Sequence, residues 1–270
     1  MEGLEGRLDI IFDLDDTLVN TGEFYRKISE QVGNWVVEHI NRRLEDPAVQ
    51  KITLEQYLVW HDEIDTKMAD DNPEFQAWRY PLSHNETYLR CCQLTGLIPD
   101  KIEERRVYSM ADRVYDFPEK HRLIDGALTV IKTLKSQGHR LHIYSWGKTT
   151  IQQDKIRETG IGKDFDQIHV VPVKDKNAIK RIVAEFATDS SPEQIWVIGD
   201  SLRKDILPAV QLGYNAIHIG SKNGWSHDHA KVDTTKFYAL PNVVHVPALI
   251  SCHYRNSEIA RQFENSLKVK

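Results

Sequence analysis

The chain has 270 residues, 40% of them hydrophobic, which is enough for a full α/β core and a smaller accessory domain. Its 35 basic and 40 acidic residues give a net charge of −5, so no basic excess would attract nucleic acid or anionic lipid. The first seven residues lack a basic segment followed by an apolar one, and no stretch reaches the length of a membrane span. We therefore expect a cytoplasmic protein with no nucleic-acid and no membrane partner. The sequence does not indicate the oligomeric state.

The first predicted strand is the apolar run at residues 8–12, which leads directly into Asp13 and Asp15. A parallel sheet places its working groups just beyond the carboxyl ends of its strands, so both carboxylates are expected where a ligand would bind. Two carboxylates this close repel each other unless a cation lies between them or one takes a proton. The pair is therefore a candidate nucleophile and acid/base, although an acidic turn that only caps the strand would give the same pattern.

The next part of the chain, residues 21–122, is predicted to be an inserted helical domain. Apolar residues at helical spacing run from 24 to 40, and no strand signal follows for roughly 100 residues. Further helix signals are capping boxes at Thr53/Gln56 and Ser83/Glu86, a stop at Gly96 and a start at 99–102.

Strands and helices alternate again from residue 123, which predicts a Rossmann-like, doubly wound parallel sheet formed by residues 1–20 and 123–270. The expected elements are helices 127–137, 149–159, 177–187 and 205–212 and strands 140–145, 167–171, 194–198 and 215–219. After Ser221 the pattern is weaker, with a sixth strand predicted at 243–246 and a last helix at 257–268. His227, Asp228 and His229 lack zinc spacing and are predicted to be a surface loop.

Polar residues follow each core strand in an ordered series. Asp13 and Asp15 follow the first strand, Ser145 ends the second, and two lysines follow the third. Asp200 comes directly after the fourth strand, and a further acid follows five residues later. In this order the residues resemble the four motifs of the haloacid dehalogenase (HAD) superfamily, and the resemblance covers about the first 220 residues except the insert. The insert is placed like the helical C1 cap of that superfamily, which usually selects the substrate.

The resemblance implies magnesium-dependent phosphoryl transfer. Asp13 would attack phosphorus and form an aspartyl phosphate, and Asp15 would protonate the leaving alcohol and later activate water. The Asp13 carboxylate, the Asp15 backbone carbonyl and the Asp200 carboxylate would bind Mg²⁺. Asp205 would orient Asp200 or a metal-bound water, or bind the metal directly.

The same resemblance assigns the phosphate-binding groups. Ser145, the backbone amides of Trp146 and Gly147, and one lysine would hold the phosphoryl oxygens. Lys174 directly follows the strand, whereas Lys176 lies where the next helix should begin, and we favour Lys176 because the family lysine usually occupies that position. Trp146 departs from the small or polar residues common there.

Asp15 favours a phosphatase over a dehalogenase within the superfamily, because the dehalogenases lack this second aspartate. The sequence thus predicts a phosphatase that acts on a small phosphorylated metabolite, whose identity it does not reveal. Two alternatives remain: a phosphomutase or phosphotransferase of the same fold, and a catalytically silent binding protein.

Overall fold

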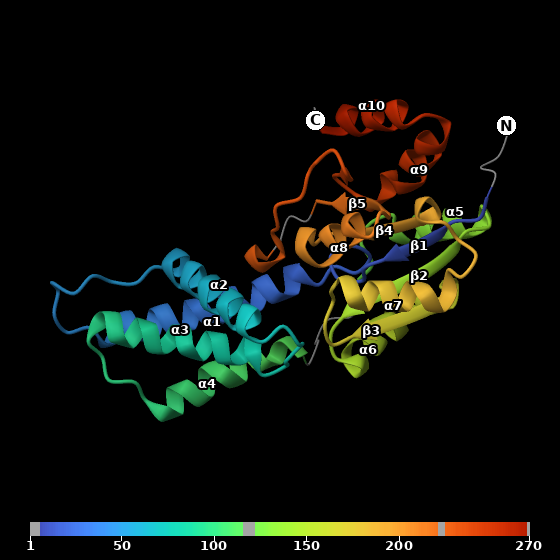
Figure 1. Cartoon of the computed structure of the whole chain (residues 1–270). Helices are drawn as coiled ribbons and strands as arrows, with labels where there is room; N and C mark the ends of the chain where they lie inside the picture. Colours follow the sequence, from blue (N-terminus) through green and yellow to red (C-terminus); the bar gives the residue numbers. More distant parts are fainter. Residues whose placement is uncertain (1–5, 116–121, 221–224, 269–270) are drawn as a thin grey trace. The chain divides into compact units, whose positions relative to one another are not determined.

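The computed structural model describes residues 6–115, 122–220 and 225–268 (Figure 1). The chain divides into two compact units. The first, here called the α/β unit, contains Met1–Thr21, His121–Gly224 and Asp228–Lys270, and the second, the helical unit, contains Gly22–Lys120 and Trp225–His227. Within the described ranges, no helix is both long and apolar enough to cross a membrane.

The α/β unit is built on a six-stranded sheet in the order β3-β2-β1-β4-β5-β6, with all strands parallel. The strands are β1 (Asp9–Phe12), β2 (Arg140–Trp146), β3 (Gln167–Val171), β4 (Ile195–Gly199), β5 (Asn215–Ile219) and β6 (Tyr238–Leu240). The strand order reverses between β1 and β4, which is where open α/β sheets bind their ligands. The prediction of a Rossmann-like doubly wound sheet is confirmed.

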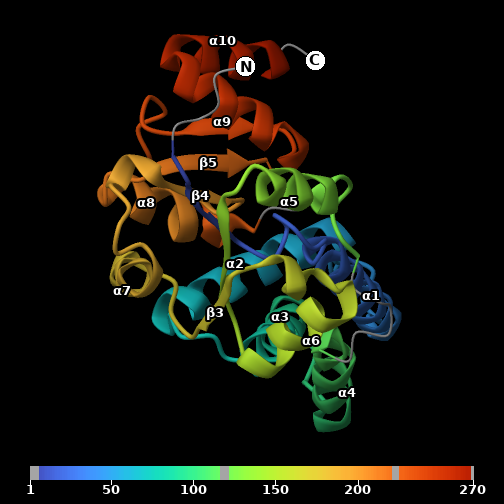
Figure 2. The same ribbon diagram turned by 90° about the vertical axis from the view of Figure 1, so that its right-hand side faces the viewer.

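Helices cover both faces of this sheet (Figure 1 and Figure 2). Ile10 and Phe12 of β1 belong to the core shared with α5 (Ala127–Ser136), α6 (Thr149–Thr159), α9 (Val246–Arg255) and α10 (Ser257–Lys268). Ile11 points to the other face, where α7 (Lys176–Phe186) and α8 (Leu207–Gln211) pack. Both faces are therefore buried, which explains why β1 is apolar at nearly every position.

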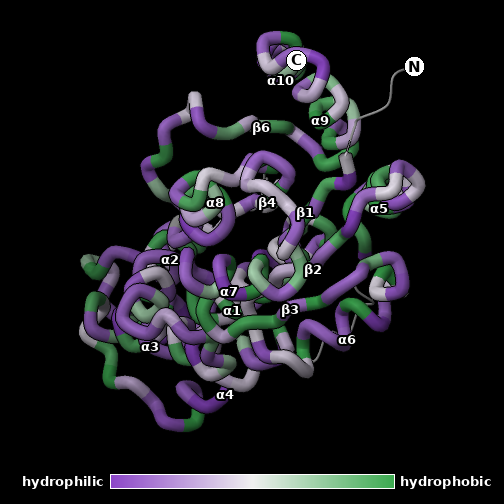
Figure 3. Tube along the Cα trace, turned by 45° about the vertical axis from the view of Figure 1, so that its right-hand side comes forward, coloured by the Kyte–Doolittle hydropathy of each residue, from purple (hydrophilic) through white to green (hydrophobic). Residues whose placement is uncertain are grey.

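The last helix, α10, confirms the helix predicted at 257–268. Hydrophobic and hydrophilic residues alternate along it (Figure 3), and Ala260, Phe263 and Leu267 pack on the core. The strand predicted at 243–246 is wrong, because these residues form a 3-10 turn, η6 (Val243–His245), and the start of α9. The Asn242 side chain accepts a hydrogen bond from the Val244 amide at 3.0 Å, which begins a helical turn instead of a strand.

The helical unit contains α1 (Gly22–Arg43), α2 (Leu54–Asp71), α3 (Arg79–Thr95), α4 (Lys101–Asp112) and the short η1 (Arg113–Tyr115). The predicted capping box of Thr53 and Gln56 opens α2, and Gly96 ends α3 with a φ of 71°. The predicted helix start at Ser83 is wrong, because α3 begins one turn earlier, at Arg79. Pro81 lies in its first turn, where a proline costs no hydrogen bond.

The chain leaves the α/β unit and returns to it along paired segments. The Asn20 amide donates to the Arg122 carbonyl at 2.9 Å, and the Ile124 amide donates to the Leu18 carbonyl at 2.9 Å. Val19 and Leu123 form an antiparallel bridge between them. The two ends of the inserted segment are thus fixed to each other by backbone hydrogen bonds.

The core of the helical unit contains two stacked histidines, His61 and His84, with ring centroids 3.6 Å apart. The Tyr57 hydroxyl lies 2.8 Å from His84 Nδ1, and Ser83 Oγ lies 3.0 Å from His61 Nε2. Burial lowers the pKa of His61 to about 4 and lowers the pKa of His84 well below its usual value. Both rings are therefore neutral in the folded protein at neutral pH.

This predicts that acid destabilises the protein through these histidines. Below their ordinary pKa of 6.5 both histidines bind protons in the unfolded chain but not in the folded protein. Their contribution to the free energy of unfolding is therefore complete above pH 6.5 and is lost as the pH falls toward 4. For His61 alone the loss between pH 7 and pH 5 should be about 2 kcal/mol in the free energy of urea unfolding.

His61→Gln, which retains a hydrogen-bonding side chain but does not titrate, should reduce this pH dependence. His229→Gln, at an exposed position, is the control and should leave it unchanged. An equal pH dependence in wild type and His61→Gln would contradict the assignment.

Candidate active site

The first acidic pair lies in a tight turn that follows β1. The Asp13 amide donates to the Ile198 carbonyl at 2.8 Å, which keeps Asp13 beside the end of β4. The amides of Leu18 and Val19 both donate to the Leu14 carbonyl, so the chain turns back immediately. Asp16 adopts a φ of 56° within this turn, a left-handed conformation that aspartate tolerates better than most residues. The turn holds Asp13 and Asp15 at the carboxyl end of the sheet.

The second acidic pair consists of Asp200, which directly follows β4, and Asp205, which lies on a π-helical turn, η4 (Leu202–Ile206), that precedes α8. The predicted single helix at 205–212 is thus two elements, and the wider turn contains Asp205. One Asp205 oxygen accepts from the Ser201 amide at 3.1 Å, and the carboxylate packs against Gly199. A Cβ atom at Gly199 would lie 2.2 Å from an Asp205 oxygen, so a glycine is required for this side-chain position.

Carboxylate oxygens from Asp13, Asp200 and Asp205 all lie within 4.8 Å of one another, the one such group found in the described parts of the chain. Burial raises the pKa of Asp13 to about 7; Lys174 opposes the rise, and the charges of Asp205 and Asp15 add to it. Burial and then Asp13 and Asp205 raise the pKa of Asp200 well above its usual value. Such a cluster of oxygen ligands fits a hard divalent cation, whose charge would offset the repulsion.

A buried lysine already offsets part of this negative charge. The Lys174 ammonium lies 2.5 Å from an oxygen of Asp13 and 2.5 Å from an oxygen of Asp205, and its side chain is 2% exposed. Burial lowers the pKa of Lys174, but the two carboxylates outweigh it and raise the pKa above its ordinary value. Lys174 is therefore charged at this site.

The preference for Lys176 over Lys174 is corrected by this geometry. Asp175 is the N-cap of α7 and accepts from the Ala178 amide at 2.7 Å, so the helix begins at Lys176. Lys176 is exposed on its first turn, whereas Lys174 precedes the cap and lies against the carboxylates. The position of the capping residue thus places Lys174, and not Lys176, against the carboxylates.

Asp15 is surrounded by donors. Thr21 Oγ1 and Lys155 Nζ approach one of its oxygens at 2.5 and 2.6 Å, and Gln152 Nε2 approaches the other at 2.6 Å. Burial raises the pKa of Asp15, but the Lys155 charge and the three hydrogen bonds outweigh it and lower the pKa. Gln152 and Lys155 are not among the predicted site residues, although their spacing places them on one face of a helix.

The predicted phosphate-binding residues lie at the end of β2. Ser145 is buried, and its hydroxyl oxygen accepts from Gln152 Nε2 at 2.6 Å. The Trp146 indole donates to the Pro172 carbonyl at 2.8 Å. The Gly147 amide donates to the Val171 carbonyl at 3.2 Å, so it extends the sheet instead of offering a donor to a ligand, contrary to expectation.

Asp228 supports the loop that follows β4. One of its oxygens accepts from Ser201 Oγ at 3.0 Å and from Lys204 Nζ at 2.6 Å. Lys204 also lies over the Trp146 ring, 4.4 Å from its centroid. Residues 227–229 were predicted to be a surface loop. This prediction is wrong for His227, which is buried, and for Asp228, whose side chain is 17% exposed.

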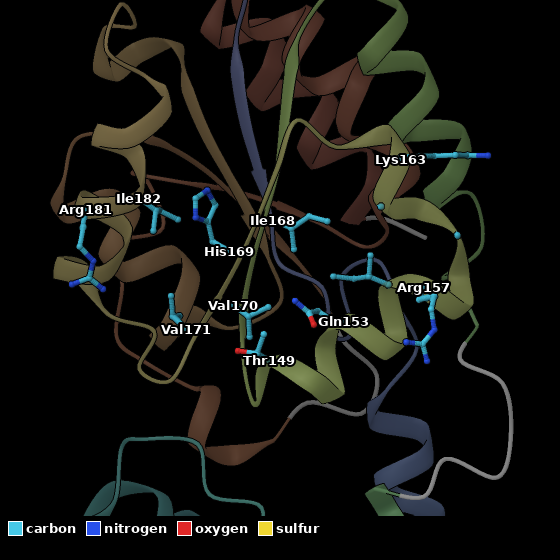
Figure 4. A pocket seen from close by; sticks show the side chains of 13 residues that line it. Thr149, Gln153, Arg157, Lys163, Ile168, His169, Val170, Val171, Arg181 and Ile182 are labelled. Atoms are coloured by element: carbon cyan, nitrogen blue, oxygen red, sulfur yellow. The ribbon is translucent and has the colours of Figure 1, made fainter.

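A cavity of about 620 Å³ lies elsewhere, along the free edge of β3. Figure 4 shows Ile168 and Val170 of this strand together with the basic side chains of Arg157 and Arg181. None of the clustered carboxylates lines it. The acidic cluster therefore lies at the strand ends and not in this cavity.

Comparisons with known proteins identify the family and the fold of the chain. The profile of the haloacid dehalogenase-like hydrolases matches residues 10–213. A haloacid dehalogenase-like family hydrolase from Xanthomonas campestris has a TM-score of 0.69 and 20% identity, over 97% of this chain and 98% of that one. A predicted phosphoglycolate phosphatase from Haemophilus somnus 129PT has a TM-score of 0.59 and 16% identity, over 92% and 100%. The putative HAD-hydrolase YfnB from Bacillus subtilis, bound to magnesium, has a TM-score of 0.57 and 18% identity, over 91% and 100%.

Haloacid dehalogenases are also among the similar structures, and no curated protein matches the chain. At these identities the solved structures establish the fold alone. The family profile, however, covers most of the chain, including the strand ends that carry Asp13, Ser145, Lys174 and Asp200. The chain belongs to the haloacid dehalogenase-like hydrolase family.

Proposed function

We propose that the protein is a magnesium-dependent phosphatase that hydrolyses a small phosphomonoester through an aspartyl phosphate. The observation that carries the proposal is the second aspartate, Asp15, held two residues from Asp13 at the edge of the acidic cluster. Cleavage of a carbon–halogen bond needs no acid for an alkoxide leaving group, whereas cleavage of an alkyl phosphate does. Carbon–halogen cleavage therefore fits this site less well than hydrolysis of a phosphate ester.

Asp13 is the proposed nucleophile. Lys174 fixes one oxygen of its carboxylate and supplies positive charge where a phosphoryl group would bind. The carboxylates of Asp13 and Asp200 and the backbone carbonyl of Asp15 are the groups proposed to hold Mg²⁺. When bound, the ion would offset the repulsion between the Asp13 carboxylate and the phosphate dianion.

Asp15 is the proposed acid and base. Its three donors keep it ionised before substrate binds, and the negative charge of an arriving phosphate raises its pKa by repulsion, which favours proton uptake. The protonated form would protonate the leaving oxygen, and the resulting carboxylate would accept a proton from the water that attacks the aspartyl phosphate. Ser145, with its own O–H proton, would donate to a phosphoryl oxygen.

A screen of phosphorylated metabolites and 2-haloacids tests the proposal. Release of inorganic phosphate from one or more monoesters, with no halide release, would support a phosphatase. Halide release without phosphate release would contradict it, and transfer of the phosphoryl group to an added alcohol or sugar would instead indicate a phosphotransferase. No turnover on either panel would favour a binding protein.

The two aspartates should respond differently to substitution. Asp13→Asn should lower kcat at least about 1,000-fold and leave no phosphoenzyme, because it removes the nucleophile. Asp15→Asn should lower kcat about 100-fold or more on an alkyl phosphate but much less on p-nitrophenyl phosphate, whose leaving group departs without a proton. Retention of a tenth of wild-type kcat by Asp13→Asn would exclude it as the nucleophile.

The metal requirement gives a second prediction. Activity should disappear in excess chelator and return with Mg²⁺, because the clustered carboxylates repel a phosphate dianion without a cation. Ca²⁺ should inhibit, since it takes more ligands and a looser geometry than Mg²⁺. Full phosphate release in excess chelator would contradict the proposed cofactor.

The two lysines provide a matched comparison. Lys174→Met should lower kcat about 100-fold or more, because it removes a buried cation beside Asp13, whereas Lys176→Met should stay within about twofold of wild type. Thermal melting of both variants shows whether the fold is retained. A larger loss in Lys176→Met than in Lys174→Met would reverse the assignment.

A further inference from the structure

We propose that Gln152 and Lys155 of α6 are positioning residues that hold Asp15, and through Gln152 also Ser145, in the geometry needed for proton transfer to the leaving group. This inference rests on the proposed phosphatase function. It adds two residues from a helix that carries none of the predicted motifs.

Their burial is the first observation. Gln152 is 2% exposed and Lys155 is 3% exposed, although α6 is otherwise a strongly polar helix. A buried ammonium is costly unless it is paired, and the Lys155 ammonium lies 2.6 Å from Asp15. The two residues are one helical turn apart, so a single face of α6 directs both side chains at the same carboxylate.

The contacts of Gln152 are the second observation. Its amide nitrogen lies 2.6 Å from an oxygen of Asp15 and 2.6 Å from Ser145 Oγ, so its two hydrogens can satisfy both acceptors. The Trp146 carbonyl lies further away, at 3.2 Å. Because Ser145 Oγ accepts this hydrogen bond, the hydroxyl proton of Ser145 is left to donate to a phosphoryl oxygen.

The space that Gln152 occupies is the third observation. A Cβ atom at Gly147 would lie 3.0 Å from both Cγ and Cδ of Gln152. The glycine at the end of β2 therefore lets the amide reach between Asp15 and Ser145. Gly147 therefore provides space for the Gln152 side chain, whereas it was expected to provide a backbone amide to the phosphate.

Together the contacts fix both oxygens of Asp15. Lys155 and Thr21 bind one oxygen, and Gln152 binds the other. A carboxylate held at both ends cannot rotate away from the leaving group, and an acid must lie within hydrogen-bond reach of the atom that it protonates. Loss of either residue should therefore impair proton transfer more than attack by Asp13.

Leaving-group dependence is the test. Gln152→Ala and Lys155→Met are compared with wild type on an alkyl phosphate and on p-nitrophenyl phosphate in the presence of Mg²⁺. We expect kcat/KM to fall about 50-fold or more on the alkyl ester and less than about 5-fold on the nitrophenyl ester. Gln153→Ala, an exposed neighbour on α6, is the matched control and should change neither value.

A double-mutant cycle separates positioning from general damage. When each substitution is added to Asp15→Asn, kcat/KM on the alkyl ester should fall by less than about a further twofold, because the group that the residue positions is already disabled. Gln152→Glu, which is similar in size but places an acceptor opposite Asp15, should reproduce the loss of Gln152→Ala. It provides the same comparison if the alanine variant does not fold.

The outcomes distinguish the inference from the proposed function. If wild type hydrolyses neither ester nor any other phosphomonoester of the screen, the proposed function fails and the inference falls with it. The positioning role alone is overturned if wild type is active but the variants lose kcat/KM equally on both esters. It is also overturned if the decrease in each double variant equals the product of the decreases in the two single variants.

Discussion

Mutual repulsion among clustered carboxylates is the constraint around which the end of the sheet is organised. Asp13, Asp200 and Asp205 converge because β1 and β4 are adjacent and parallel, and burial raises the pKa values of Asp13 and Asp200. Lys174 compensates part of this charge from the β3 side of the sheet, and Lys155 compensates Asp15 from α6. Lys174 pairs with both Asp13 and Asp205, and Lys155 pairs with Asp15, so charge balance and side-chain position are set by the same contacts.

Much of the fold and of the acidic cluster could be predicted because parallel strands impose their own geometry. An apolar run that is buried on both faces must end at the edge where the other strands end, and Asp13, Ser145 and Asp200 each lie there. The helical insert was equally evident from its periodicity and from the capping box at Thr53. These features follow from local sequence patterns and from the geometry that every doubly wound parallel sheet shares.

Other features depend on contacts that local patterns do not specify. Asp175 caps α7, so Lys176 lies on the exposed first turn of the helix, whereas Lys174 precedes the cap and lies against the carboxylates. Gln152 and Lys155 resemble solvated helix residues, and only the packing of α6 shows that they point inward. One signal was present: Ile156, a buried apolar residue, lies four positions after Gln152 on the same helical face, so a polar pair shares that face with the core.

The paired backbone segments at Leu18–Asn20 and Arg122–Ile124 have a consequence for how the chain reaches this fold. Every contact between β1 and β2 must close a loop that contains the entire inserted segment, and the entropic cost of such closure delays folding. An insert that is itself compact and has its ends joined by hydrogen bonds replaces that long flexible loop with a short connection. The order of assembly is thereby constrained: once the insert is compact, β1 can find β2 nearly as easily as if the two strands were neighbours in sequence.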